Sequence, residues 1–283
     1  MAVHDTPHSP VHSPPRSPVH SPVACDLADT GCVPVIDLNA DLAESDLVRD
    51  EDLAMVGLVT SANLACGFHA GNRAVMRALA AACAERGVVV GAHVSYRDRD
   101  GFGRHPRNVT PVRLAADLVE QWETLVDEAA AAGAAVAYVK PHGALYHAMA
   151  GDPAVADVVV GSLAPHCPVL VAPPASAVEV PARDAGMRVV HEGFVDRGYD
   201  PAGHLVDRSE PGALIEDDAS VADRARTLAV DHRIVAVDGT WLTLGVDTLC
   251  LHGDHAGAVA RARAVRDALR VAGVTVTAFA GPR

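Results

Sequence analysis

The sequence has few aromatic residues, more acidic than basic groups and no long apolar stretch. Aromatic residues make up 4% of its 283 positions, and its formal net charge is −13 with histidine counted neutral. This balance disfavours nucleic acid and anionic membranes as partners, because phosphate groups are bound by basic surfaces. No run of about 18 apolar residues predicts a membrane span. No basic start followed by an apolar stretch predicts a signal peptide.

Cysteine pairs of the CxxC type are also missing. This spacing gives no support for a zinc cluster or a thioredoxin-type motif. Scattered cysteines among apolar neighbours instead predict buried, reduced thiols in a cytoplasmic protein. The six are Cys25, Cys32, Cys66, Cys83, Cys167 and Cys250.

Lysine is almost absent. Lys140 is the only lysine among the 23 Lys and Arg residues. Unlike arginine, lysine can lose its proton or place a compact ammonium against a phosphate or carbonyl oxygen. A neutral choice of base is the alternative, but the use of arginine everywhere else favours a functional role for Lys140.

Low complexity characterises residues 1–34, where His-Ser-Pro recurs at 8–10, 12–14 and 20–22. Proline removes backbone donors and serine adds no core, so this tail is predicted to be disordered, with polyproline-like character. Histidine-rich tracts can bind metal weakly, although a dispensable extension is the favoured interpretation. One folded domain is therefore expected at 35–283.

Polar residues follow most of the predicted strands. Asp37, Asn39 and Asp41 alternate at the end of a strand candidate at 33–38, which puts them on one face. Three buried polar groups are costly unless they bind something, so a ligand site is favoured over a capped turn. Two glycines bracket His69 in the next such segment, a pattern that also suits a simple turn. Similar clusters follow at 91–96, 140–146, 191–199 and 252–255.

Strands and helices alternate about seven times along this body. Helices are predicted at 72–86, with Asn72 as N-cap and Gly87 as stop, and at 110–132, where Thr110 can cap. The alternation predicts parallel βαβ units. Because at least six strand ends carry polar clusters, we predict a closed or nearly closed α/β barrel. An open doubly wound sheet binds ligands at one crevice and needs fewer functional strand ends.

Six of these stretches, in the same order, resemble the LamB/YcsF family. The resemblance covers roughly residues 35–280 and implies an irregular seven-stranded, TIM-like β/α barrel of the glycoside hydrolase/deacetylase type. The six stretches are DLNAD (37–41), SANLACGFHAG (61–71), GAHVSYRDRDGFGR (91–104), YVKPHGALY (138–146), HEGFVDRGYDPAGHLVDR (191–208) and LCLHGDHAGAV (249–259).

The resemblance implies ATP-dependent opening of the lactam ring of 5-oxo-L-proline to L-glutamate. Family members are the A subunit of bacterial 5-oxoprolinase, so subunits B and C are implied as partners and ATP as a cofactor. A lactam is a poor electrophile, and phosphorylation of its carbonyl oxygen would create a better leaving group. That route requires cations on the phosphates and a carboxylate or imidazole to handle water.

Carried over to this sequence, the resemblance implies two groups of site residues. Asp41 serves as base and Lys140 contacts a phosphate or the activated oxygen, with His142 and Glu192 as further catalytic residues. The residues expected to bind substrate or phosphate are Asp37, Asn39, Asn63, Arg104, Arg197, His252 and Asp254.

The likeness to deacetylases implies a divalent metal as a second cofactor. Those enzymes hold it with one Asp and two His, and the matching residues here are Asp41, His69 and His93. Such ligands suit a catalytic metal site with an open position; hydrogen bonds among them, or to substrate, are the alternative. A stand-alone metal-dependent amide or carbohydrate deacetylase and a non-catalytic relative are therefore the competing functions.

The chain departs from the family pattern close to Asp41. The usual LGEG is replaced by Leu42, Ala43, Glu44 and Ser45, and the stretch that follows is shorter. Further on, His147 replaces an Asn and Asp207 replaces a Pro. A lost glycine and a shorter loop narrow or reshape the expected pocket, so a divergent relative acting on another lactam or amide is a further alternative.

Overall fold

The computed structural model describes residues 33–252 and 257–281. The predictions for residues 1–32 and for Asp254 lie outside the described residues. From Val33 onward the chain forms one compact unit. None of the helices in the described ranges is both long and apolar enough to cross a membrane. The four cysteines in these ranges are buried and form no disulfide, as predicted for them.

Seven parallel strands close into a barrel, which confirms the predicted fold class. Each strand pairs with the next in the order β1-β2-β3-β4-β5-β6-β9, and β9 pairs back with β1. A further strand, β10 (Thr275–Val276), pairs with the start of β1. The barrel strands are β1 (Val35–Leu42), β2 (Ser61–Ala65), β3 (Val89–Val94), β4 (Val136–Pro141), β5 (Val169–Ala172), β6 (Arg188–Phe194) and β9 (Thr248–His252).

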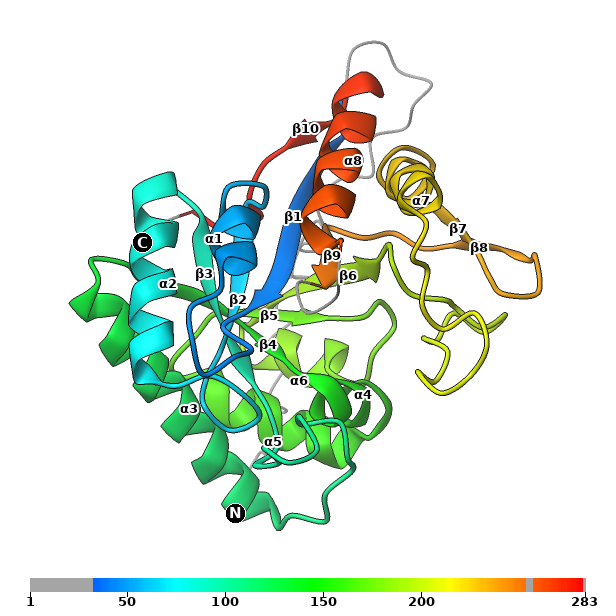
Figure 1. Ribbon diagram of the computed structural model, residues 1–283. Helices are drawn as coiled ribbons and strands as arrows, with labels where there is room; N and C mark the ends of the chain where they lie inside the picture. Colours follow the sequence, from blue (N-terminus) through cyan, green and yellow to red (C-terminus); the bar gives the residue numbers. More distant parts are fainter. Residues whose placement is uncertain (1–32, 253–256, 282–283) are drawn as a thin grey trace, which may run out of the picture. The chain divides into compact units, whose positions relative to one another are not determined.

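Helices surround the strands (Figure 1). Asn72 and Thr110 accept the predicted N-cap hydrogen bonds from Val75 and Arg113, and Gly87 ends its helix in the left-handed region. A short antiparallel hairpin of β7 (Arg233–Val235) and β8 (Trp241–Thr243) projects beside α7. The helices are α1 (Asp50–Val56), α2 (Arg73–Arg86), α3 (Pro111–Ala131), α4 (Gly143–Gly151), α5 (Pro153–Leu163), α6 (Glu179–Asp184), α7 (Asp218–Asp231) and α8 (Ala258–Val271).

The two faces of β1 differ in chemistry although both are buried. Leu38 and Leu42 belong to the hydrophobic core. Asp37, Asn39 and Asp41 alternate with these core residues and hydrogen-bond to side chains of other barrel strands. The barrel interior therefore carries polar side chains toward the carboxyl ends of the strands and a small apolar cluster that includes Val89, Tyr138 and Val171, while the main apolar core lies between the strands and the surrounding helices.

The strands extend further than the sequence predicted. The first strand was expected to stop at residue 38, but β1 continues to Leu42, and β3 and β6 continue to Val94 and Phe194. Backbone ladder bonds persist there because the buried polar side chains are satisfied across the barrel. Several functional side chains thus project from regular strands, where neighbouring ladders fix them, and not from flexible loops.

Gly91 and Tyr138 show how the narrow interior is filled. The two residues are paired across β3 and β4. A Cβ atom on Gly91 would lie 2.1 Å from the Tyr138 ring. Glycine is therefore required at this position so that the ring can lie inside the barrel, where its hydroxyl donates a hydrogen bond to Asn63 Oδ1 at 2.6 Å.

Candidate active site

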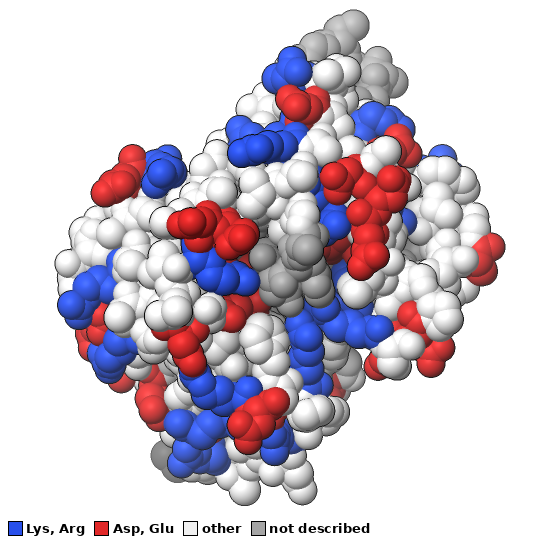
Figure 2. All heavy atoms as spheres, viewed as in Figure 1, with Lys and Arg blue, Asp and Glu red and all other residues white. Residues whose placement is uncertain are grey.

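A pocket of about 150 Å³ opens at the carboxyl ends of the barrel strands. Arg208, Phe194 and Tyr146 complete its wall. On the face drawn in Figure 2, Lys and Arg side chains gather near the centre among acidic groups. The predicted site residues that line the pocket are Asp41, His93, Arg104, Lys140, His142, Arg197 and His252.

Three predicted substrate-binding residues, Asp37, Asn39 and Asn63, lie beneath the pocket and do not line it. Asp37 accepts hydrogen bonds from the hydroxyls of Thr60, Ser61 and Thr248. Asn39 donates to Thr248 and accepts from Asn63, each at 2.7 Å. These side chains are at most 1% exposed, and the hydrogen bonds named here join them to one another and to neighbouring residues of the barrel. Burial raises the pKa of Asp37 to about 6, although its three hydroxyl partners oppose the rise.

Lys140 lies at the centre of the polar interior. Its Nζ atom is 2.7 Å from Asp41 Oδ1, 2.8 Å from Glu192 Oε1 and 3.1 Å from Cys250 Sγ. Burial alone would favour a neutral amine, but Asp41 and the other acidic neighbours hold the Lys140 pKa well above its usual range. The side chain is therefore held as an ammonium among these groups, and its expected contact with a phosphate or carbonyl oxygen stays a prediction.

Asp41 is ionised by the same contacts. Burial opposes its ionisation, but His93 and Lys140 together hold the pKa of this carboxyl well below its usual range. Asn63 donates a further hydrogen bond to Oδ1 at 2.8 Å. Glu192 lies on the far side of the ammonium, 1% exposed and away from the pocket surface.

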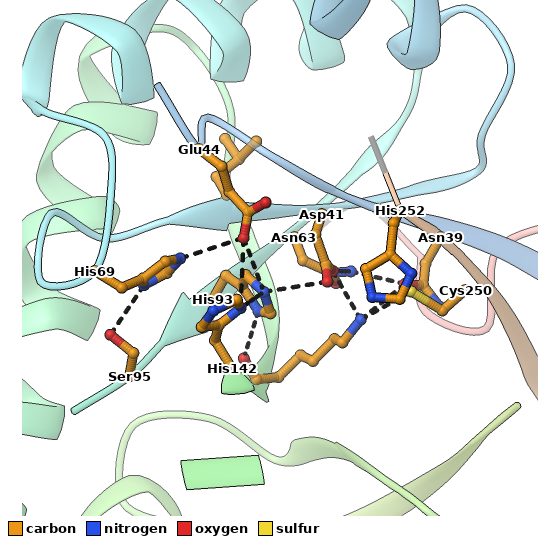
Figure 3. A network of polar contacts seen from close by, with 12 residues as sticks. Asn39, Asp41, Glu44, Asn63, His69, His93, Ser95, His142, Cys250 and His252 are labelled. Atoms are coloured by element: carbon orange, nitrogen blue, oxygen red, sulfur yellow. Dashed lines mark hydrogen bonds and ion pairs between the residues drawn. The ribbon is translucent and has the colours of Figure 1, made fainter. Parts of the chain in front are cut away.

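Three imidazoles and a carboxylate meet beside Asp41. Figure 3 shows Glu44, His69, His93 and His142 pointing toward one another. The acceptor or donor atoms that they contribute all lie within 4.8 Å of one another. Burial, and then the neighbouring imidazoles, hold the pKa values of His69 and His142 well below their usual range.

A glycine-rich loop covers this imidazole cluster. His142 Nε2 donates to the carbonyl of Phe102, and the Phe102 ring contacts His69 and His142 edge to face. A Cβ atom on Gly103 would lie 2.8 Å from the His142 ring and 2.9 Å from His69 Cβ. The loop that carries the predicted phosphate-binding residue Arg104 therefore packs on the histidines, and Arg104 alone of its arginines lines the pocket.

The expected metal set is only partly brought together. His69 and His93 are in the cluster, as predicted. Asp41 Oδ2 lies 3.3 Å from His93 Nε2, but its other oxygen is taken by Lys140 and Asn63. Glu44 and His142 complete the cluster in place of Asp41, because the chain turns after β1 and directs Glu44 toward the imidazoles.

The opposite wall of the pocket is an acid–imidazole–guanidinium series. Asp196 accepts a hydrogen bond from His252 Nδ1 at 3.0 Å, and Arg208 Nη2 lies 2.9 Å from His252 Nε2. Burial opposes charge on both members of the Asp196–His252 pair. Their mutual attraction nevertheless lowers the pKa of Asp196 to about 2 and raises that of His252.

Arg197 was predicted to bind substrate or phosphate, but its guanidinium donates hydrogen bonds to the backbone of a neighbouring loop. Its Nε and Nη2 donate to the carbonyls of Ala213 and Val206. It therefore fixes the loop between β6 and α7. Burial and the neighbouring Arg208 lower its pKa to about 10.

Sequence reasoning missed several residues that shape the site. Arg208 was quoted only within a motif, and Glu44 only as part of a departure from the family pattern. No local pattern singles out the remaining ones, because their partners are distant in sequence. The missed residues are Glu44, Ser95, Tyr138, Tyr146, Asp196, Phe194, Arg208 and Cys250.

Comparisons with known proteins match most of the chain to one protein family. The family model described as LamB/YcsF family matches residues 36–283. The chain is 49% identical over 249 residues to a protein of Mycobacterium avium (strain 104) named as the A subunit of 5-oxoprolinase, covering 86% of this chain and 98% of that protein. It is 46% identical over 250 residues to the protein of the same name from Streptomyces griseus subsp. griseus, with 87% and 100% covered.

A solved structure has the same fold. The crystal structure of a lactam utilization protein from Thermus thermophilus superposes with a TM-score of 0.81 at 39% sequence identity. The match covers 87% of this chain and 100% of that chain. The barrel therefore belongs to an architecture that this relative shares.

Proposed function

The chain belongs to the LamB/YcsF family, and we propose that it is the A subunit of a 5-oxoprolinase, which hydrolyses 5-oxo-L-proline to L-glutamate. The observation that carries the proposal is the pocket itself. A buried ammonium and an ionised carboxylate lie at its base, and arginines line its side. A small cyclic amide with one carboxylate suits such a pocket, because Arg side chains bind carboxylates in a forked geometry.

In this proposal Lys140 faces the activated carbonyl oxygen and Asp41 accepts the proton of the attacking water. Asp41 bonded to the ammonium is a weak base. An anionic oxygen that approaches Lys140 competes for the ammonium and makes Asp41 more basic. His142 and Glu192 assist, the first from the pocket wall and the second by holding Lys140. Arg104, with Arg208, receives the substrate carboxylate.

We assign ATP to the partner subunits and not to this pocket. Pockets for drug-sized ligands span about 300–1,000 Å³, whereas this one measures about 150 Å³. The relatives are named as one lettered subunit of 5-oxoprolinase, which implies an enzyme of several subunits. Subunits B and C are the expected partners, and one of them is expected to bind the nucleotide that activates the lactam.

The alternative of a stand-alone amide or carbohydrate deacetylase is less well supported. The curated relatives quoted above carry the name of a lactam-opening enzyme, and the Thermus structure carries the name of a lactam utilization protein. The two functions differ in a simple requirement, because only a 5-oxoprolinase needs ATP and partner subunits.

Glutamate release from 5-oxoproline tests the proposal. The chain is co-expressed with subunits B and C, and release is measured with and without ATP. We expect release only from the full complex with ATP, and its loss in Asp41→Asn and Lys140→Met. Asp127→Asn, a matched change at an exposed position of α3, should leave it intact. No release from the full complex, or unchanged release in Lys140→Met, would contradict the proposal.

A further inference from the structure

The four side chains of the imidazole cluster have the spacing of a metal coordination shell. Glu44 Oε1 lies 3.4 Å from His69 Nε2, 3.4 Å from His142 Nδ1 and 3.8 Å from His93 Nε2. His142 Nδ1 lies 2.9 Å from His93 Nε2. Ligands about 2.0–2.1 Å from a tetrahedral ion are about 3.3 Å from one another. The observed distances bracket this value.

Hydrogen bonds on the far side of each ring fix which nitrogen carries hydrogen. His93 Nδ1 donates to the carbonyl of Lys140, and His142 Nε2 donates to the carbonyl of Phe102. Ser95 gives its single hydroxyl hydrogen to the carbonyl of Tyr96, so it accepts from His69 Nδ1. In the neutral rings, the nitrogens that face the cluster centre therefore all carry lone pairs.

Lone pairs that face one another repel, so this arrangement is stable only with a positive charge, such as a proton or a metal ion, between the nitrogens. His93 Nε2 and His142 Nδ1 are within hydrogen-bond distance, and either a proton or a metal ion between the rings removes the repulsion of their facing lone pairs. His69 Nε2 is buried and has no hydrogen-bond partner among the described residues. Histidines that bind metals use their other ring nitrogen in the same way, as donor to a carbonyl or hydroxyl.

We propose that Glu44, His69, His93 and His142 bind one Zn²⁺ ion. Three imidazole nitrogens and one carboxylate oxygen are ligands that Zn²⁺ accepts in tetrahedral geometry. Four protein ligands complete that shell, which is typical of an ion with a structural role. The ion joins the carboxyl ends of β1, β2, β3 and β4 and so fixes one wall of the pocket. Asp41 is left to Lys140.

Metal binding to the full chain is the direct test. His4, His8, His12 and His20 are replaced by Gln, to remove weak binding by the tail, and the protein is purified without an affinity tag. After chelation and dialysis, Zn²⁺ is titrated by calorimetry and Co²⁺ by visible absorption. We expect one ion per chain, the absorption of a four-coordinate Co²⁺ site, and a higher melting temperature with Zn²⁺.

Substitutions separate a metal site from a set of hydrogen bonds. Glu44→Gln keeps the shape but loses the charge, and should weaken Zn²⁺ binding more than tenfold. Ser95→Ala removes the outer hydrogen bond of His69, together with the one to the Tyr96 carbonyl, and should weaken Zn²⁺ binding roughly tenfold or more. His166→Gln, at an exposed position, should have no effect.

Circular dichroism confirms that each variant is folded before it is titrated. The proposal is overturned if the parent chain binds less than one Zn²⁺, or if folded Glu44→Gln and His69→Gln bind it as tightly as the parent. The inference goes beyond the proposed reaction, because loss of lactam hydrolysis in the full complex with normal Zn²⁺ binding would affect only the catalytic proposal.

Discussion

Ala43 is the residue that directs Glu44 into the imidazole cluster. Its φ of 62° lies in the left-handed region, where a Cβ atom costs about 1–2 kcal/mol. The methyl group is fully buried, and its burial offsets part of this strain. A backbone conformation that alanine resists is thus maintained beside the site.

Substitution of Ala43 should reveal this balance. Ala43→Gly should change the free energy of unfolding by less than about 1 kcal/mol, because strain relief is offset by lost burial and by glycine's greater freedom in the unfolded chain. Ala43→Val should destabilise the protein by at least about 2 kcal/mol, since a β-branched residue is poorly tolerated at positive φ. Urea denaturation measures both, and equal tolerance of Gly and Val would argue against the strained turn.

Asp37 should make the protein less stable as the pH rises, which is the reverse of the usual effect of a carboxyl group. Its pKa is about 6 in the folded protein and 3.8 in the reference state, so the folded state binds more protons between these values. This group's contribution to stability is therefore greatest below about pH 4 and falls as pH rises to about 6. The difference of about two pKa units corresponds to roughly 3 kcal/mol.

Asp37→Asn isolates that contribution. The variant should gain stability relative to the parent as the pH of urea denaturation rises from about 4 to about 7, by on the order of 1–3 kcal/mol. Asp157→Asn, at an exposed position of α5, provides the control and should track the parent. A constant difference between Asp37→Asn and the parent across this range would show that burial does not shift the Asp37 pKa.

At the level of elements, the pairing of β3 with β4 requires a glycine at residue 91, where β3 faces Tyr138. A methyl group at residue 91 would overlap the Tyr138 ring. Gly91→Ala should therefore destabilise the protein by about 3 kcal/mol, the upper end of overpacking effects. The double variant Gly91→Ala/Tyr138→Leu should lose less than the sum of the two single changes. Additive losses in thermal melts would mean that the two residues do not compete for space.

The sequence was sufficient to place these elements but not to say how deep their side chains lie. Apolar periodicity and caps predicted α2 and α3, and alternation predicted one shared face for Asp37, Asn39 and Asp41. Alternation gives the face but not the depth, so it could not show that Asp41 alone of the three reaches the pocket. That depends on barrel closure, which brings Asp37 to Thr248, a partner 211 positions away.

The position of Glu44 could not be predicted from the sequence either, because it depends on the backbone conformation of the preceding turn. It follows a turn whose left-handed Ala43 has no reliable sequence signal, since alanine usually avoids that region. The partners of His252 were hidden too, because Asp196 is 56 positions away. Polar residues that alternate along a strand could be located from local patterns, whereas residues whose role depends on a loop conformation or a distant partner could not.

In the whole barrel, the two ends have different roles. The carboxyl ends of the strands carry the pocket and the imidazole cluster. Near the other end, Phe279 packs against Tyr138 with ring centroids 4.9 Å apart, and Arg188 donates to the Phe279 carbonyl at 3.0 Å. The C-terminal segment after β10 therefore contributes to closing the barrel, at the end where such folds place stabilising residues and not catalytic ones.

Loss of the Phe279 ring should therefore lower stability and leave the site unchanged. Phe279→Ala should destabilise the protein by about 1–3 kcal/mol, less than for a fully buried Phe because this ring is only partly buried. The KM for 5-oxoproline in the complete complex and the Zn²⁺ affinity should stay at parental values at a temperature where the variant is folded. Phe102→Ala, which removes the ring over His69 and His142, is the contrasting change and should alter both. A Phe279→Ala protein that melts like the parent but binds substrate poorly would mean that the end of the barrel near Phe279 controls the pocket and that the two ends do not have separate roles.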